Sequence, residues 1–140
     1  MYKRQFKDPL PAPASKMSRL ADYSDKSLPI DIRARAYLHS NCSHCHRKWG
    51  GGNADFQLLV TIPLEKTEIL KELPTHGDFD IAGAKLLSPG EPDRSLILYR
   101  MMKLGLGRMP HIASNVPDEE AIKLIRTWIS NLPSEMSSRK

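Results

Sequence analysis

The 140 residues suffice for one compact domain but not comfortably for two, and 40% apolar with 26% charged residues indicates a folded chain. No apolar run is long enough for a membrane span, and no signal-peptide pattern is visible at the start. The net charge of +5 comes from scattered Lys and Arg residues without a basic helix, which argues against nucleic acid and leaves a partner with an acidic docking surface open. We expect a monomer.

The N-terminal third contains a linker and then a helix. Residues 1–30 are rich in proline and turn residues, which predicts a linker or N-terminal extension. Residues 31–41 are good helix formers, with Asp31 as the expected N-cap and an apolar face that includes Ala34, Tyr37 and Leu38. This helix leads directly into the two cysteines of the chain, after which a Gly-Gly-Gly-Asn stretch ends the element.

The middle of the chain, residues 53–88, gives the least regular pattern. Short strands over 56–62 and 84–87, separated by one or two turns of helix within 64–73, would form a small β-hairpin. An irregular insertion is the alternative, because prolines and glycines interrupt every apolar run.

Two further helices are expected toward the C-terminus. Asp93 should cap a helix over 94–103, which two glycines end. Asp118 should open the last helix, which Pro133 stops and which presents one apolar stripe: Ile122, Ile125, Trp128, Ile129 and Leu132. Together these elements predict an all-α domain over 31–133, followed by a flexible tail over 134–140.

The two cysteines lie in the sequence Cys42-Ser43-His44-Cys45-His46. Such a pair serves in thiol–disulfide exchange, in zinc binding or in covalent haem attachment. Cysteines at i and i+3 of a helical turn project to the same side, so both can form thioethers with one porphyrin while His46 offers a ligand to its iron. A zinc site needs four ligands, and a thioredoxin-type pair follows a strand. The sequence therefore favours haem c bound through Cys42, Cys45 and His46.

The second axial ligand of the iron is expected to be Met109. This residue lies on an irregular loop after two glycines and directly before Pro110, whereas the other methionines of the C-terminal half fall in a helix or in the tail. A methionine thioether favours ferrous iron and raises the reduction potential. His111 is an alternative ligand or a partner of a haem propionate, and His76 is a less favoured one.

Several other residues are candidates for contacts to the haem propionates, because carboxylates near a haem edge need hydrogen-bond donors. They are Arg108, Trp49, Asn53 and Arg47. Nucleophile elbows, paired acid–base carboxylates and phosphate-binding loops are absent from the sequence, so we expect an electron carrier and not an enzyme.

The chain resembles class I cytochromes c over residues 31–132. The resemblance is carried by Ala34, Tyr37 and Leu38 before the cysteines, Asn41 next to Cys42, Met109-Pro110 on the later loop, and Trp128-Ile129 in the last helix. It implies an all-α fold around one covalent haem, with the first and last helices crossing near Ala34, Tyr37 and Trp128. It also implies His/Met ligation and one-electron transfer.

A closer resemblance is to cytochrome c domains attached to large secreted proteins of planctomycetes and related bacteria. It is carried by four stretches: Asn41–Arg47, Gly50–Asp55, Pro74–Gly77 and Gly107–Ile112. This likeness implies a periplasmic or extracellular location, a redox partner protein or an upstream catalytic domain as electron donor, and a chain excised from a longer exported protein. A haem sensor or peroxidase-like domain with a labile or open sixth coordination site is the alternative function.

Overall fold

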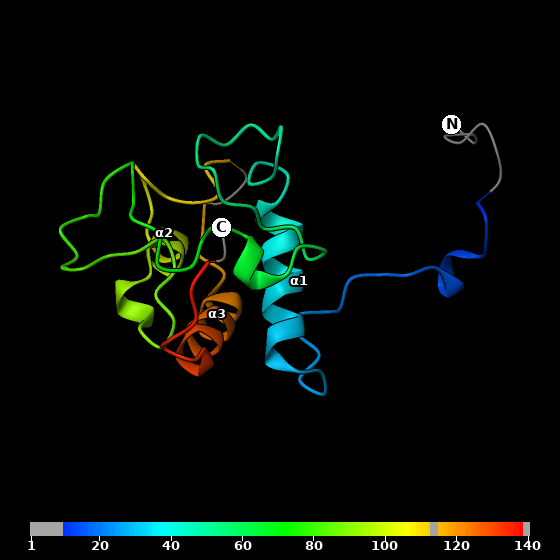
Figure 1. Ribbon diagram of the computed structural model, residues 1–140. Helices are drawn as coiled ribbons and strands as arrows, with labels where there is room; N and C mark the ends of the chain where they lie inside the picture. Colours follow the sequence, from blue (N-terminus) through cyan, green and yellow to red (C-terminus); the bar gives the residue numbers. More distant parts are fainter. Residues whose placement is uncertain (1–9, 113–114, 139–140) are drawn as a thin grey trace.

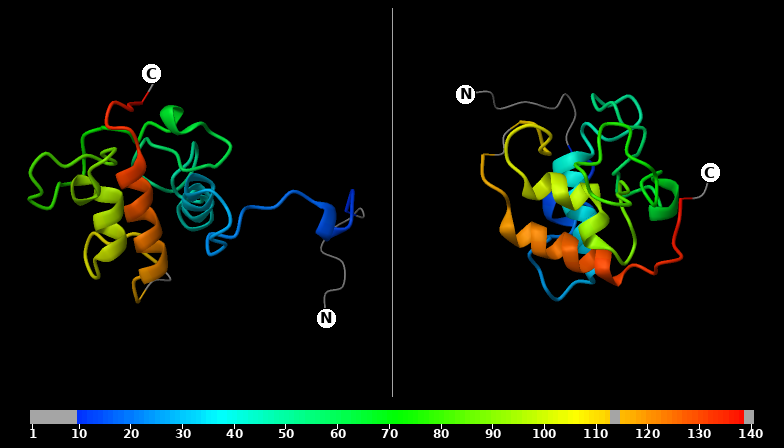
Figure 2. Two further views of the ribbon diagram at one scale, coloured as in Figure 1. Left: turned by 90° about the horizontal axis from the view of Figure 1, so that it is seen from below. Right: turned by 90° about the vertical axis from the view of Figure 1, so that its left-hand side faces the viewer.

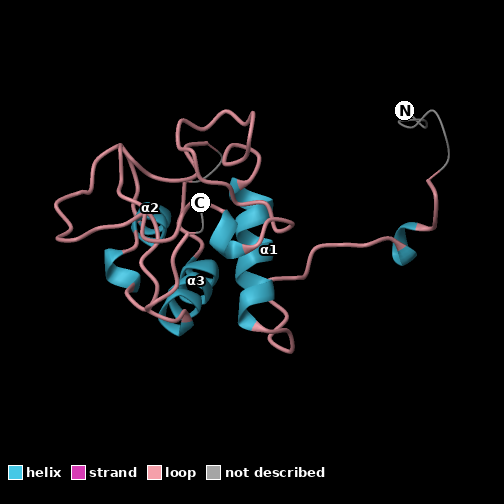
Figure 3. Ribbon diagram, viewed as in Figure 1, coloured by secondary structure: helices cyan, strands magenta, loops and turns pink. Residues whose placement is uncertain are grey.

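A computed structural model describes residues 10–112 and 115–138 (Figure 1). Predictions that concern residues 1–9, 113–114 and 139–140 lie outside the described residues. The described chain is built from three α-helices and three short 3-10 helices: η1 (Ala14–Lys16), α1 (Ile30–Cys42), η2 (Leu64–Lys66), η3 (Pro92–Arg94), α2 (Leu96–Met102) and α3 (Glu119–Asn131). Figure 3 shows helices joined by long loops, with no strand among the described residues. The predicted all-α class is therefore confirmed.

The core lies where α1 packs against α3. Ala34 and Leu38 on α1 are buried, as are Trp128 and Ile129 on α3, and all four belong to one apolar cluster. The indole N–H of Trp128 donates a hydrogen bond of 2.8 Å to the carboxylate of Asp31, which links the two helices at their edge. The contact between the first and last helices is thus confirmed near the residues that the sequence pattern indicates.

Helix α3 follows its sequence pattern closely. The Asp118 carboxylate accepts a hydrogen bond of 3.0 Å from the Ala121 amide, which is the expected N-cap interaction. The stripe of Ile122, Ile125 and Ile129 is buried. Figure 2 shows α2 lying beside α3 in both views, so α3 contacts the other two helices.

Asp31 and Asp93 do not cap helices, contrary to the prediction. Helix α1 begins after Pro29 without a side-chain cap, and Asp31 lies within its first turn. Helix α2 begins at Leu96 rather than near residue 94. Asp93 instead accepts a hydrogen bond of 2.7 Å from Arg126 on α3. In both cases the carboxylate accepts a hydrogen bond from a side chain on α3, Trp128 for Asp31 and Arg126 for Asp93.

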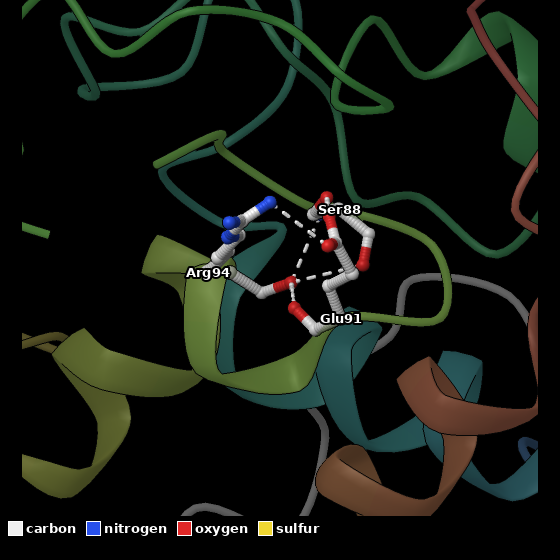
Figure 4. Close-up of polar contacts among 4 residues, drawn as sticks. Ser88, Glu91 and Arg94 are labelled. Carbon is white, nitrogen blue, oxygen red and sulfur yellow. Dashed lines mark hydrogen bonds and ion pairs between the residues drawn. The ribbon is translucent and has the colours of Figure 1, made fainter. Parts of the chain in front are cut away.

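A polar turn precedes α2, as the close-up in Figure 4 shows. The Glu91 carboxylate accepts hydrogen bonds from the Ser88 hydroxyl at 2.8 Å and from the Arg94 guanidinium at 3.0 Å. The buried Ser95 hydroxyl donates to the backbone carbonyl of Glu91 at 3.0 Å. These bonds close the turn that leads into α2.

The expected strands over 56–62 and 84–87 do not form. The Leu58 amide donates to the carbonyl of His46 at 2.8 Å, and the Gln57 amide donates to that of Thr67 at 2.8 Å. Backbone groups of this region thus pair singly with several segments, and the described residues form two isolated bridges in place of a ladder. The helix expected within 64–73 is limited to η2. The irregular insertion, and not the hairpin, describes residues 53–88.

The segments before residue 31 and after residue 133 differ in how far they lie from the domain. Figure 1 shows the dark-blue part of the segment before α1 extending away from the rest of the chain. Tyr23 returns to the domain: its ring lies edge-on to Tyr37 at 5.1 Å, and its carbonyl accepts from the Arg33 guanidinium at 2.7 Å. At the other end, the Ser138 hydroxyl accepts from the Leu70 amide at 3.0 Å. The described part of the predicted flexible tail therefore lies against the domain.

Among the described residues, none of the helices combines the length and the apolar character that crossing a bilayer requires.

Candidate functional site

The two cysteines lie at the C-terminal end of α1. The amides of Cys45 and His46 donate to the carbonyl of Cys42 at 3.2 and 2.9 Å, so one tight turn carries all three side chains. Both cysteines are free thiols and half-buried. Burial, with a smaller contribution from the neighbouring Cys45, raises the pKa of Cys42 to about 12. Cys42 is therefore an uncharged thiol at neutral pH.

His46 is buried, with only 9% of its surface exposed. Its ring stacks on Phe56 with centroids 4.3 Å apart and planes 9° apart, and its buried Nδ1 atom has no hydrogen-bond partner in the part of the chain that the structure describes. Burial lowers the pKa of His46, and the charges of His44, His111 and Arg100 lower it further. The ring is thus held in its neutral form, which is the form that binds metals.

A glycine loop closes over this turn. A Cβ on Gly50 would lie 2.2 Å from the carbonyl oxygen of Cys45, so any other residue at this position would clash with the backbone unless the loop moved. The Gly52 amide donates to the same carbonyl at 3.2 Å, and a Cβ on Gly52 would lie 3.5 Å from Nδ1 of His46. The sequence pattern indicates only that these glycines end a helix. In the structure they allow the loop to approach the cysteine turn.

Gly50→Ala should destabilise the cysteine turn, whereas Gly51→Ala should not. The added methyl at position 50 meets backbone atoms, so we expect a cost of about 1–3 kcal/mol in the free energy of unfolding, as for other overpacked sites. A Cβ on Gly51 meets nothing within 4 Å, and its effect should stay within about 0.5 kcal/mol. Urea denaturation of the two variants measures the difference. Equal free energies of unfolding would show that the loop does not approach Cys45 as described.

A cavity of about 420 Å³ lies between the end of α1, the loop after α2 and the start of α3. Side chains from all three segments line it, among them Tyr37, Asn41, Cys42, Met101, Arg108 and Met109. This volume is within the range of ligand-binding pockets in proteins. The cavity brings one cysteine of the motif together with the methionine that the sequence analysis selects.

The loop that carries Met109 is anchored to α2. The amide of Met109 donates to the carbonyl of Arg100 at 2.9 Å, and the Arg108 guanidinium donates to the carbonyl of His111 at 3.0 Å. Met109 is half-buried, and its peptide bond with Pro110 is cis. The loop thus has defined hydrogen bonds on both sides of the methionine.

The structure brings together some of the predicted site residues and not others. Cys42, Arg108 and Met109 line the cavity, whereas Cys45 and His46 lie on the adjoining turn and do not line it. Trp49, at 92% exposure, and the exposed Asn53 are also outside its lining, so the structure does not bring them to the cavity.

The remaining candidates are exposed. Arg47, His76 and His111 all have exposed side chains, and none of them lines the cavity. The carbonyl of His76 accepts from Arg100 at 3.0 Å, which is a structural contact.

Tyr37 and Asp118 are lining residues that the sequence analysis treats only as a packing residue and a helix cap. Burial raises the pKa of Tyr37, and the nearby Asp118 carboxylate raises it further. The signal available in the sequence is the spacing of Tyr37 and Asn41, which places them one turn apart on the face that leads to Cys42. The position of Asp118 depends on how α3 packs, which no local pattern gives.

The side chains that could act as ligands distinguish a zinc site from a haem site. In the part of the chain that the structure describes, no three His, Cys, Asp or Glu side chains are grouped so that they could hold a metal ion. A zinc site made of side chains alone is therefore disfavoured. Covalent haem needs less from the protein: two free thiols on one turn, a neutral imidazole next to them and space beside a thiol. The residues present fit that requirement.

Comparison with protein-family models, with curated proteins and with solved structures found no match for this chain. What it does must therefore be inferred from its own side chains.

Proposed function

We propose that this chain is an electron-transfer domain with the class I cytochrome c fold, which carries one haem covalently bound through Cys42 and Cys45. His46 and Met109 would bind its iron from the two sides. One observation carries the proposal: Cys42 lines the same cavity as Met109, while the turn that continues from Cys42 holds the buried His46, whose Nδ1 atom has no hydrogen-bond partner among the described residues.

Each protein group has a definite task in this proposal. Haem supplies one-electron chemistry at its iron, with a potential that the axial ligands and burial set. The stacking of His46 on Phe56 fixes the plane of the imidazole, and burial keeps it neutral. The thioether of Met109 favours ferrous iron.

If His46 and Met109 both bind the iron, no coordination position would be left for a substrate. The domain therefore acts as a carrier and not as an enzyme, and its partner is a redox protein or a catalytic domain upstream in a longer exported chain. The net charge of +5 favours a partner with an acidic surface. A periplasmic or extracellular location goes with this assignment.

An absorption spectrum of the purified chain, produced with a c-type haem maturation system, tests the proposal. We expect a Soret band that survives acid–acetone extraction, because the haem is covalently bound. The oxidised protein should show the far-red charge-transfer band of a thioether ligand, and the reduced protein should not bind carbon monoxide readily. Bound haem without the far-red band and with rapid carbon monoxide binding would instead favour the sensor or peroxidase-like function. Absence of a Soret band would reject haem binding.

A further inference from the structure

Arg100, in the last turn of α2, is the centre of the contacts that hold the Met109 loop. Its carbonyl accepts the hydrogen bond from the Met109 amide at 2.9 Å. Its guanidinium donates to the carbonyl of Gly107 at 3.0 Å and, through its second terminal nitrogen, to the carbonyl of His76 at 3.0 Å. One residue thus joins the loop before Met109, the insertion around His76 and the end of α2.

The guanidinium of Arg100 rests on the ring of Phe79. Its Cζ atom lies 4.7 Å from the ring centroid, within the range of a cation–π contact. Two further groups contact the Phe79 ring. The ring centroid of Tyr99 lies 4.9 Å from that of Phe79, and the Lys103 ammonium lies 5.6 Å from the Phe79 centroid. Phe79 is therefore enclosed by groups from α2 and the loop that follows it.

Phe79 is also held in an unfavourable backbone conformation. Its φ is +57°, and that of Asp80 is +60°, a region that side-chain-bearing residues rarely occupy. Such strain persists only where the surrounding contacts determine the conformation. The contacts of the Phe79 ring with Arg100 and Tyr99 supply that determination.

Gly107 completes the contact from the loop side. Its φ is +83°, and a Cβ at this position would lie 2.7 Å from Cζ of Phe79 and 3.7 Å from a terminal nitrogen of Arg100. The turn two residues before Met109 therefore lies directly against the Phe79 ring. The backbone that leads to the methionine is therefore packed against Phe79 and bonded to Arg100.

We propose that Arg100, seated on Phe79, is a positioning residue that fixes where the Met109 side chain lies in the cavity. This inference rests on the proposed function, since it concerns the ligand role of Met109. An arginine suits the task because its planar guanidinium can donate to two carbonyls while it stacks on an aromatic ring, whereas a lysine ammonium cannot do both with defined geometry.

The test compares Arg100→Met and Arg100→Lys in the haem-loaded protein, with Arg94→Met as the matched control. Arg94 is exposed and pairs with Glu91, away from the loop. Arg100→Met removes both side-chain hydrogen bonds and leaves the backbone bond to Met109. We expect the far-red thioether band to fall by at least about half and carbon monoxide to bind about tenfold faster, because the loop opens more often. Arg100→Lys should give smaller changes, and Arg94→Met none.

Hydrogen exchange of the Met109 amide in the reduced protein gives a second readout that does not depend on which group ligates the iron. Arg100→Met should accelerate it about tenfold, as expected when local opening becomes easier. Should Arg100→Met fail to fold, Phe79→Leu removes the ring beneath the guanidinium and should change both readouts in the same direction.

The outcomes separate the two proposals. Unchanged exchange and an unchanged far-red band in the Arg100→Met and Phe79→Leu variants would overturn the positioning role of Arg100. Faster exchange in these variants, combined with a wild-type protein that lacks the far-red band, would support the positioning of the loop but reject Met109 as ligand.

Discussion

Replacing both Cys42 and Cys45 with serine should abolish covalent haem attachment. The two thiols lie on one turn closed by the amides of Cys45 and His46, and a serine hydroxyl cannot form the thioether bond to the porphyrin. A denaturing gel stained for haem should therefore show a strong band for the wild type and none for the double variant. Acid–acetone extraction should remove any haem that the double variant still binds through its axial ligands.

The matched control for this prediction is His44→Ala, which changes an exposed residue between the two cysteines. Its haem stain should equal that of the wild type. The single variants Cys42→Ser and Cys45→Ser should each retain one thioether, so mass spectrometry should find one haem attached to part of the population. Covalent haem in the double variant would mean that the attachment site lies elsewhere and would reject the assignment of the motif.

The first and last helices are predictable because each presents its apolar residues to the same neighbour. Ala34 and Leu38 on one helix, and Ile125 and Ile129 on the other, recur at helical spacing, and all four are buried. The packing of a regular apolar stripe depends mainly on its period, which the sequence contains. Their contact with each other is implied by the resemblance to class I cytochromes c, because a period does not say which helix will cover a stripe.

The three predicted caps show where local reasoning is insufficient. Asp118 caps α3 as expected because its partner, the Ala121 amide, is three residues away. Asp31 and Asp93 have the same residue type in similar positions, but their carboxylates bond to Trp128 and Arg126, both on α3. A long-range donor thus replaces a local one, and no window of sequence around either aspartate contains it.

The insertion and the supports of the site depend on contacts between distant segments. Residues 56–62 have the apolar character of a strand, yet the Leu58 amide bonds to His46 and finds no continuous partner. In the same way, the requirement for Gly50 arises only from its approach to Cys45. The sequence identifies groups that carry chemistry by residue type and spacing, whereas the residues that position them are identified only by the packing.

Met109→Ala should lower the reduction potential and open the iron to external ligands. Loss of the thioether removes the ligand that favours ferrous iron, so we expect a decrease on the order of 0.1 V, well within the range of about 0.8 V over which axial ligands tune haem potentials. The far-red thioether band should disappear, and carbon monoxide should bind to the reduced protein at one equivalent per haem. Redox titration and carbon monoxide difference spectra measure these changes.

The two methionines of α2, Met101 and Met102, provide the control and the competing candidate for the iron ligand. Met102 is partly exposed, and its sulfur lies 3.8 Å from an Arg126 nitrogen, so Met102→Ala should leave the potential and the far-red band unchanged. Met101 lines the cavity together with Met109, which makes it the methionine that could compete for the iron. A far-red band that is lost in Met101→Ala and retained in Met109→Ala would transfer the ligand role to the helix.

His111 is the remaining alternative, and the same variant separates it from Met109. His111 is only two residues from the methionine. Its side chain is exposed and does not line the cavity, and its carbonyl accepts a hydrogen bond from Arg108. If the loop lets this imidazole replace the thioether, Met109→Ala will remain six-coordinate and low-spin. Met109→Ala combined with His111→Ala should then become five-coordinate and bind carbon monoxide. We expect Met109→Ala alone to be five-coordinate and to bind carbon monoxide, because the loop that is bonded to Arg100 holds His111 at the surface.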